Sequence, residues 1–158
     1  MSENNLLETE INAIMDSMVS HALSLGVFSA VNEHEPKSQM GNAMTCAIWC
    51  DRIGPASGLS GLASTTGLLT FMARIYLPAL QQPYDMIDAN MIVATSRLIG
   101  AYTADFTFSD RLYAVDLQGM TGQPLEGRAG YLTQDSKLYR VMTITVPLIV
   151  NDVWEQVA

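Results

Sequence analysis

The sequence predicts an α+β fold, in which two long helices pack against a mostly antiparallel sheet, as a single domain over residues 1–158. Two segments repeat apolar residues every three or four positions, which is typical of amphipathic helices. Several other segments are rich in β-branched and aromatic residues and are bounded by turn formers, which is typical of strands. A chain of this length buries a sufficient core without disulfide or metal staples.

The two predicted helices are defined by their apolar periodicity. The first spans about Asn5 to Leu25, and Gly26 follows it as a natural C-terminal cap. The second opens near Pro83-Tyr-Asp85 and runs to about Thr103, because proline and aspartate suit the first turn of a helix. This second helix is the best candidate to pack across the sheet, through the stripe Ile87, Met91, Ala94, Leu98 and Tyr102.

Two apolar runs, 44–50 and 69–77, are predicted to be central strands. In the second run, alternate residues face opposite sides of the sheet. One side is purely apolar and the other is mixed, carrying Thr70, Met72, Arg74 and Tyr76. Between the runs, Gly54–Gly67 contains four glycines and no charge, and it predicts a long Gly/Ser loop that is mobile or functional.

Shorter strands are predicted at 27–31, 111–117 and 129–134, and a long final strand at 137–147. The last two form a hairpin that turns at Asp135-Ser136. Because Pro147 cannot donate a hydrogen bond to a ladder, we expect the final strand to end there, to bulge there or to lie at an edge.

Composition indicates an oligomer. Charged residues make up only 15% of the chain and hydrophobic residues 49%, whereas an average soluble domain is about 25% charged. Polar residues interrupt every apolar run before the ~20 residues that a membrane helix needs, so a large subunit interface is the better destination for this apolar surplus. The acidic N-terminal segment, with no Lys or Arg before Lys37, is unlike a signal peptide and predicts a cytosolic start.

The net charge of −8 argues against nucleic-acid binding. The eight Lys and Arg residues are scattered singly, so there is no basic patch. An acidic surface is compatible with a conduit that DNA slides through, and equally with a charge that only confers solubility.

No catalytic, cofactor or metal signature is present. Cys46 and Cys50 lie about 13 Å apart on an extended strand, which excludes a disulfide between them, and we expect both to be reduced and buried. His21 and His34 lack the paired spacing of a zinc site. The glycine-rich segment lacks the ending of a phosphate-binding loop and contains no Gly-x-Ser-x-Gly, so we expect neither a nucleotide site nor a serine nucleophile.

The order of elements resembles the tail terminator proteins of long-tailed bacteriophages, the actinobacteriophage kind in particular. The likeness extends from Leu7-x-x-x-Ile11 through the Pro83-Tyr-Asp85 helix to the closing strands. It implies a structural virion protein without catalytic residues, assembled in the host cytoplasm, of which six copies form a ring at the head-proximal end of the tail tube. The ring would stop tube growth and present a surface to the neck. Other neck, tail-completion or tail tube subunits share the pattern, and a small-ligand-binding or enzymatic α+β domain is the rival class.

The resemblance implies as partners other copies of the chain, the tail tube protein and a neck protein, with genomic DNA passing through unbound. We expect the Gly/Ser loop to be ordered by a neighbouring subunit; the alternative is a passive surface loop. We expect Arg74 to pair with a carboxylate, either of a neighbour or of its own subunit. We also expect acid on the DNA-facing side, carried by the segment Gln118–Gly127 and the helix ends. The predicted interface residues are Gly54, Gly58, Leu59, Gly61, Leu62, Gly67, Arg74 and Tyr76.

Overall fold

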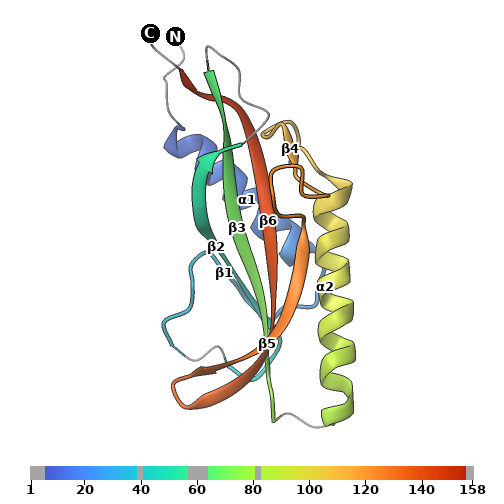
Figure 1. Cartoon of the computed structure of the whole chain (residues 1–158). Coiled ribbons are helices and arrows are strands. Elements are labelled where there is room, and N and C mark those ends of the chain that lie inside the picture. Colours follow the sequence, from blue (N-terminus) through green and yellow to red (C-terminus); the bar gives the residue numbers. More distant parts are fainter. Residues whose placement is uncertain (1–5, 39–40, 57–63, 81–82, 156–158) are drawn as a thin grey trace.

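The computed structural model describes residues 6–38, 41–56, 64–80 and 83–155 (Figure 1). The described strands form one six-stranded sheet in the order β1-β2-β3-β6-β4, with β5 also paired to β6. β1 and β2 are parallel, and the other pairs are antiparallel. This confirms the predicted α+β class. The elements in chain order are α1 (Glu8–Ser24), β1 (Val31–Asn32), β2 (Thr45–Pro55), β3 (Ser64–Pro78), the 3₁₀ helix η1 (Tyr84–Met86), α2 (Ile87–Ala104), β4 (Ala114–Val115), β5 (Glu126–Gln134) and β6 (Lys137–Glu155).

Both helices pack against the same face of the sheet and form the main core with it. The predicted stripe of α2 is buried at every position, and the apolar set of β3 that begins at Leu69 and ends at Leu77 faces it. Gly26 has a φ of +70°, and its N–H donates to the carbonyl of Leu23, which confirms it as the cap of α1. The helices therefore occupy one side of the sheet and leave the other side to different contacts.

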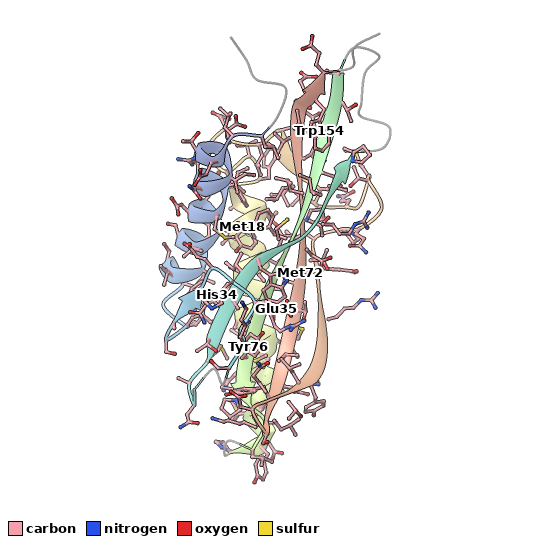
Figure 2. All side chains as sticks on the ribbon, turned by 90° about the vertical axis from the view of Figure 1, so that its left-hand side faces the viewer. Met18, His34, Glu35, Met72, Tyr76 and Trp154 are labelled. Atoms are coloured by element: carbon pink, nitrogen blue, oxygen red, sulfur yellow. The ribbon has the colours of Figure 1, made fainter. Side chains whose placement is uncertain are left out.

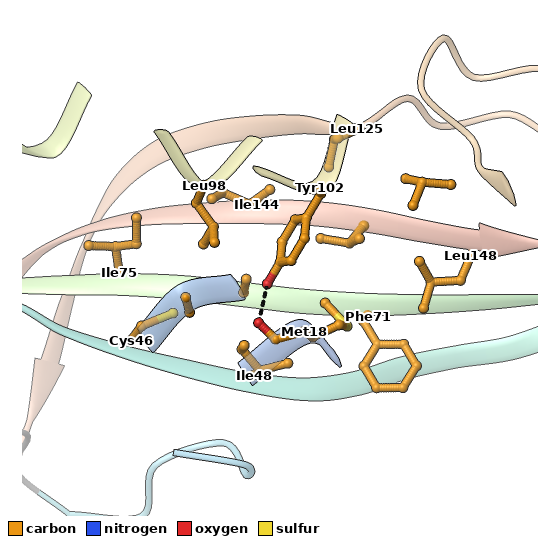
Figure 3. Close-up of a cluster of buried hydrophobic side chains, with 14 of the residues drawn as sticks. Met18, Cys46, Ile48, Phe71, Ile75, Leu98, Tyr102, Leu125, Ile144 and Leu148 are labelled. Atoms are coloured by element: carbon orange, nitrogen blue, oxygen red, sulfur yellow. Dashed lines mark hydrogen bonds between the residues drawn. The ribbon is translucent and has the colours of Figure 1, made fainter. Parts of the chain in front are cut away.

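A buried hydrogen bond ties the two helices together at the centre of the core. The hydroxyl of Tyr102 on α2 donates to the carbonyl of Met18 on α1 over 3.0 Å (Figure 3). Burial raises the pKa of Tyr102 well above its ordinary value, so the hydroxyl stays a donor. The Tyr102 ring also lies 5.8 Å from the ring of Phe108, between centroids.

The central strands are longer than predicted, and the loop between them is shorter. Gly54 and Gly67 lie in paired strands, because Gly54 faces Leu68 and Pro55 faces Gly67 in the ladder. A Cβ at Gly67 would lie 3.0 Å from a methyl group of Val153, at an irregularity between β3 and β6, which explains glycine at this strand position. The remaining predicted loop residues Gly58, Leu59, Gly61 and Leu62 lie outside the described residues.

The final strand continues past Pro147, so none of the three expectations for that residue was right. β6 runs on to Glu155, with β3 beside it on one side and β5, then β4, on the other. The carbonyl of Pro147 accepts from the N–H of Asp116, so the nitrogen of Pro147 also faces away from β3. On that side Pro147 lies between two ladder pairs, Glu126 of β5 with Thr145 and Val115 of β4 with Leu148. No neighbouring strand therefore needs a hydrogen-bond donor from Pro147.

Two shorter predictions were also inaccurate. Only Val31–Asn32 form the strand expected at 27–31, and only Ala114–Val115 form the strand expected at 111–117. Before β4 the chain makes turns in which Phe108, Ser109 and Asp110 all have positive φ, of 47°, 57° and 66°. Phe108 is fully buried there, so core packing of its ring offsets the cost of the left-handed backbone.

The hairpin turn between β5 and β6 is where predicted. Gln134 pairs with Lys137, and Asp135 and Ser136 have φ of 49° and 65°, as a type I′ turn requires. Replacing Ser136 with glycine should raise the free energy of unfolding by about 1 kcal/mol, because glycine has no Cβ to strain in this conformation. Chemical denaturation measures this, with Ser20→Gly on the exposed side of α1 as the matched control, which should destabilise. A Ser136→Gly variant no more stable than the wild type would contradict the turn assignment.

Candidate assembly surfaces

The side of the sheet away from the helices presents three rows of side chains, which we call the open sheet face. The rows are set by the strand register, in which directly opposed residues share a side. No described helix covers this side. Each row crosses the sheet from β2 through β3 to β6 and, in the first two rows, on to β5. The first row is Ala47, Arg74, Thr143 and Arg128, the second is Trp49, Met72, Thr145 and Glu126, and the third is Arg52, Thr70 and Pro147.

Arg74 lies at the centre of the open sheet face and is half-buried. Its Nε donates to the hydroxyl of Thr143 over 2.9 Å, and its guanidinium carbon lies 5.1 Å from the centre of the Trp49 ring. Among the described residues Arg74 has no ion-pair partner. The stacking and the hydrogen bond hold its position and leave further N–H groups available for a carboxylate.

Tyr76 has a different environment, although it lies on the same side of β3. It is 1% exposed, and its ring meets that of Tyr139 edge to face at 5.9 Å. Figure 2 shows His34 and Glu35 beside it, so the segment after β1 crosses this end of the sheet. Of the predicted interface residues, the sheet therefore brings Arg74 to an accessible surface and places Tyr76 in a small second core with Ala47, Tyr139 and Val141.

Exposed apolar side chains gather where α2 begins, in what we call the first end patch: Leu80, Tyr84, Met86 and Tyr131, which are 48–73% exposed. Leu80, Tyr84 and Tyr131 line one depression of about 410 Å³. Arg140 forms its floor: the guanidinium lies 4.5 Å from the centre of the Tyr131 ring and pairs with Asp88 at 2.9 Å. The patch is thus held in place by contacts from both α2 and the β5–β6 hairpin.

A second end patch lies beyond the other end of α2 and consists of Phe106, Tyr113 and Met120, which are 49–67% exposed. Asp116 organises it, since its carboxylate accepts hydrogen bonds from the N–H groups of Gly119, Met120 and Thr121 and from the Thr121 hydroxyl. Burial tends to raise the pKa of Asp116, but these hydrogen bonds outweigh it and hold the pKa below its ordinary value. The loop that displays Met120 is therefore ordered by an ionised carboxylate.

Titratable groups converge in one polar cavity of about 390 Å³, between α1 and the turn after α2. His21 Nε2 lies 2.9 Å from a carboxylate oxygen of Asp105, and Arg111 donates to the hydroxyl of Ser17 and to the carbonyl of Phe108. Burial opposes ionisation of Asp105, but the Ser109 amide, His21 and Arg111 together lower its pKa.

This is the concave site that an enzyme would require, and the sequence did not reveal it, because His21 and Asp105 are 84 positions apart. The geometry of this cavity favours a structural role, in which its side chains link α1 to the turn after α2. The hydroxyl of Ser17 accepts a hydrogen bond from Arg111, and His21 Nε2 faces the carboxylate of Asp105, so these side chains are engaged with one another.

The two cysteines differ. Cys46 is buried, and burial raises its pKa to about 12. Cys50 is exposed, contrary to the prediction, because it lies next to the bulge in β2 and beyond the part of that strand that β1 flanks. Within the described ranges no three His, Cys, Asp or Glu side chains form a metal-binding group. No described helix is both long and apolar enough to cross a membrane.

Comparison with known proteins gives distant structural similarities. No protein-family model matches the chain, and no curated protein matches it. Among solved structures, it is similar to the sheath/tube terminator of an extracellular contractile injection system in its extended state, with a TM-score of 0.34 and 15% identity over 98% of this chain and 60% of the other. It is also similar to a chain of the virion of a native gene transfer agent particle, with a TM-score of 0.36 and 9% identity over 95% of this chain and 100% of the other. The chain thus spans 60% of the length of the injection-system terminator.

Proposed function

We propose that this protein is a structural subunit of a phage-like tail, which assembles into a ring at the head-proximal end of the tail tube, ends tube polymerisation and joins the tail to the neck. The observation that carries the proposal is the pair of end patches at opposite ends of α2. A ring subunit between a tube and a neck needs two axial surfaces as well as two lateral ones. The order of elements that resembles tail terminators supports the same assignment.

The end patches are far enough apart to bind different partners. α2 contains 18 residues, so at 1.5 Å per residue it separates them by about 27 Å. Large exposed aromatic and methionine side chains are enriched in protein interfaces, and each patch groups several of them around a shallow depression. One patch would bind the tube protein and the other the neck protein.

The proposed ring holds no catalytic residue and no cofactor, and DNA passes through it without specific binding. Exposed carboxylates lie on the helix layer, at Glu8, Glu10, Asp16, Asp85, Asp88 and Asp110, and in similar number elsewhere, at Glu33, Glu35, Asp51, Glu126, Asp135, Asp152 and Glu155. Of the segments expected to carry acid, Gln118–Gly127 contains only Glu126. That acid lines the DNA-facing side of the ring therefore stays a prediction, which the charges mapped onto a ring structure would test.

Tube growth in the presence of the purified protein tests the function. Wild-type protein should stop the growth of tubes from tail tube protein, and micrographs should show density at one tube end. Met120→Asp and Tyr131→Asp disrupt the second and first end patches respectively, and both side chains are at least 65% exposed, so both variants should fold. One of them should lose tube capping and the other should keep it.

A matched control is Asn12→Asp, on the exposed side of α1 and away from both patches. It should cap tubes as the wild type does. Tubes that elongate equally with and without wild-type protein would contradict the proposed function. Loss of capping in both patch variants, or in neither, would contradict the assignment of the two ends.

A further inference from the structure

We propose that neighbouring copies join head to tail, with the helix layer of one copy covering the open sheet face of the next and α2 lying along its strands. This inference rests on the proposed ring function and names the two surfaces through which the ring closes. The shape of the two faces, their apolar content and their charge all support it.

The open sheet face has the character of an interface that is only half covered. Trp49 and Met72 are partly exposed at its centre, beside the partly exposed Thr143 and Thr145. Thr70, by contrast, is only 3% exposed in the single chain. Antiparallel sheets can leave one face to solvent, and such a face then normally alternates to polar residues. Here the centre is a tryptophan, a methionine and small hydroxyl side chains, which suit contact with a helix.

The outer side of α2 has the matching character. One stripe of its exposed residues carries no charge: Ala89, Ile92, Val93, Ser96, Gly100 and Thr103. The charged residues Asp88 and Arg97 are also exposed on α2. Ile92 and Val93 are 59% and 57% exposed. A Cβ at Gly100 would meet nothing within 4 Å, so nothing in the described chain requires glycine at a position where it costs about 1 kcal/mol relative to alanine. Close approach of another backbone accounts for that choice.

The charges of the two faces are complementary. The open sheet face carries three arginines, Arg52, Arg74 and Arg128, against the single carboxylate of Glu126, which lies 4.0 Å from Arg128. The helix layer carries six exposed carboxylates and the arginines Arg97 and Arg111. In a chain with net charge −8, such a basic face is suited to an acidic one of the same protein. Arg74, with its remaining N–H groups, would then meet a carboxylate of the neighbour.

The dimensions fit. A helix about 27 Å long and about 10 Å wide lies within the length of β3 and β6, which contain 15 and 19 residues. A stable interface buries about 800 Å² per partner, so the flanking acidic turns would have to contribute to the contact as well as α2. Because the two contacting surfaces differ, the contact is heterologous and does not stop at a dimer; repeating it gives a ring when the rotation between copies closes and an open filament when it does not.

Two variants, each disabled on one face only, test this. Arg128→Glu/Thr145→Glu alters the open sheet face, and Ile92→Arg/Ser96→Arg alters the outer side of α2. All four side chains are exposed or partly exposed. Each variant alone should remain a folded monomer of 17.2 kDa by analytical ultracentrifugation, with the circular dichroism of the wild type. Mixed in equal amounts over a concentration series, the two variants should form a 1:1 dimer of doubled mass and nothing larger. In that dimer the unaltered helix layer of one variant binds the unaltered open sheet face of the other, and both remaining faces are disabled.

Thr133→Glu on β5 is a matched control outside both surfaces and should assemble as the wild type does. Assembly of either single-face variant by itself, or failure of the mixture to dimerise, would overturn the head-to-tail contact. If the wild type forms rings and the face variants do too, this inference fails and the ring function stands. If the wild type forms no ring under any condition, the proposed function itself fails.

Discussion

Replacing Tyr102 with alanine should lower the free energy of unfolding by about 4 kcal/mol, because it removes a large aromatic side chain from the centre of the core. The side chain is fully buried and meets the rings of His21 and Phe108. Alanine would leave a cavity between the helices and would also remove the hydrogen bond to Met18. Domains of this size are stable by only about 5–15 kcal/mol, so a large share of the stability would be lost. Urea denaturation at equilibrium measures it.

Two further variants separate the parts of this effect. Tyr102→Phe keeps the ring and removes only the hydroxyl, so it should lose about 1 kcal/mol. Tyr84→Ala removes a tyrosine that is 56% exposed and should change the stability by less than about 0.5 kcal/mol. A Tyr102→Ala protein as stable as Tyr84→Ala would show that the helices do not pack as described.

Replacing Asp116 with asparagine should lower the free energy of unfolding by about 2 kcal/mol at neutral pH. Asp116 is 3% exposed, and its carboxylate accepts four hydrogen bonds from the loop that displays Met120. An amide in its place would turn an NH₂ group toward N–H donors. The variant should also cap tubes or join the neck less well, because the second end patch would lose its order.

The pH dependence of this effect has a definite sign. The folded-state pKa of Asp116 is lower than its ordinary value of 3.8, so its carboxylate stabilises the fold at pH values above that figure. This stabilisation is lost as the pH falls through the folded-state pKa. The stability difference between wild type and Asp116→Asn should therefore be largest near neutral pH and should shrink below about pH 4. An equal difference at pH 3 and pH 7 would contradict the role given to the ionised carboxylate.

The sequence was most informative where one physical pattern dominates. The helices follow from apolar periodicity, and the alternation of β3 follows from the pleat, since neither depends on distant residues. The Asp135-Ser136 turn was found because hairpin turns are local.

The errors arose where tertiary contacts override local preference. Pro147 indicates the end of a strand, but it lies beside the gap between β4 and β5, where its missing N–H is not needed. The position of β4, about 30 residues earlier in the chain, sets that gap, so the local sequence could not reveal it. Gly54 and Gly67 indicate a loop, yet Gly67 is required by the close approach of Val153. A left-handed turn at Phe108, Ser109 and Asp110, anchored by the buried Phe108 ring, precedes the strand expected at 111–117, of which only Ala114–Val115 pair.

The candidate surfaces could be predicted only in part. Arg74 was recognised because strand alternation places it on the mixed side. The end patches were missed, although Tyr84 lies in the first turn of the predicted second helix and Phe106 just beyond its end, because exposure of an apolar residue is a property of the whole fold.

The mass of the purified protein in solution, alone and mixed with tail tube protein, decides whether the chain is a ring subunit. We expect a closed ring whose mass is a whole multiple of 17.2 kDa, present alone or formed on the tube ends. A compact monomer of 17.2 kDa in both samples, at every concentration, would contradict the ring.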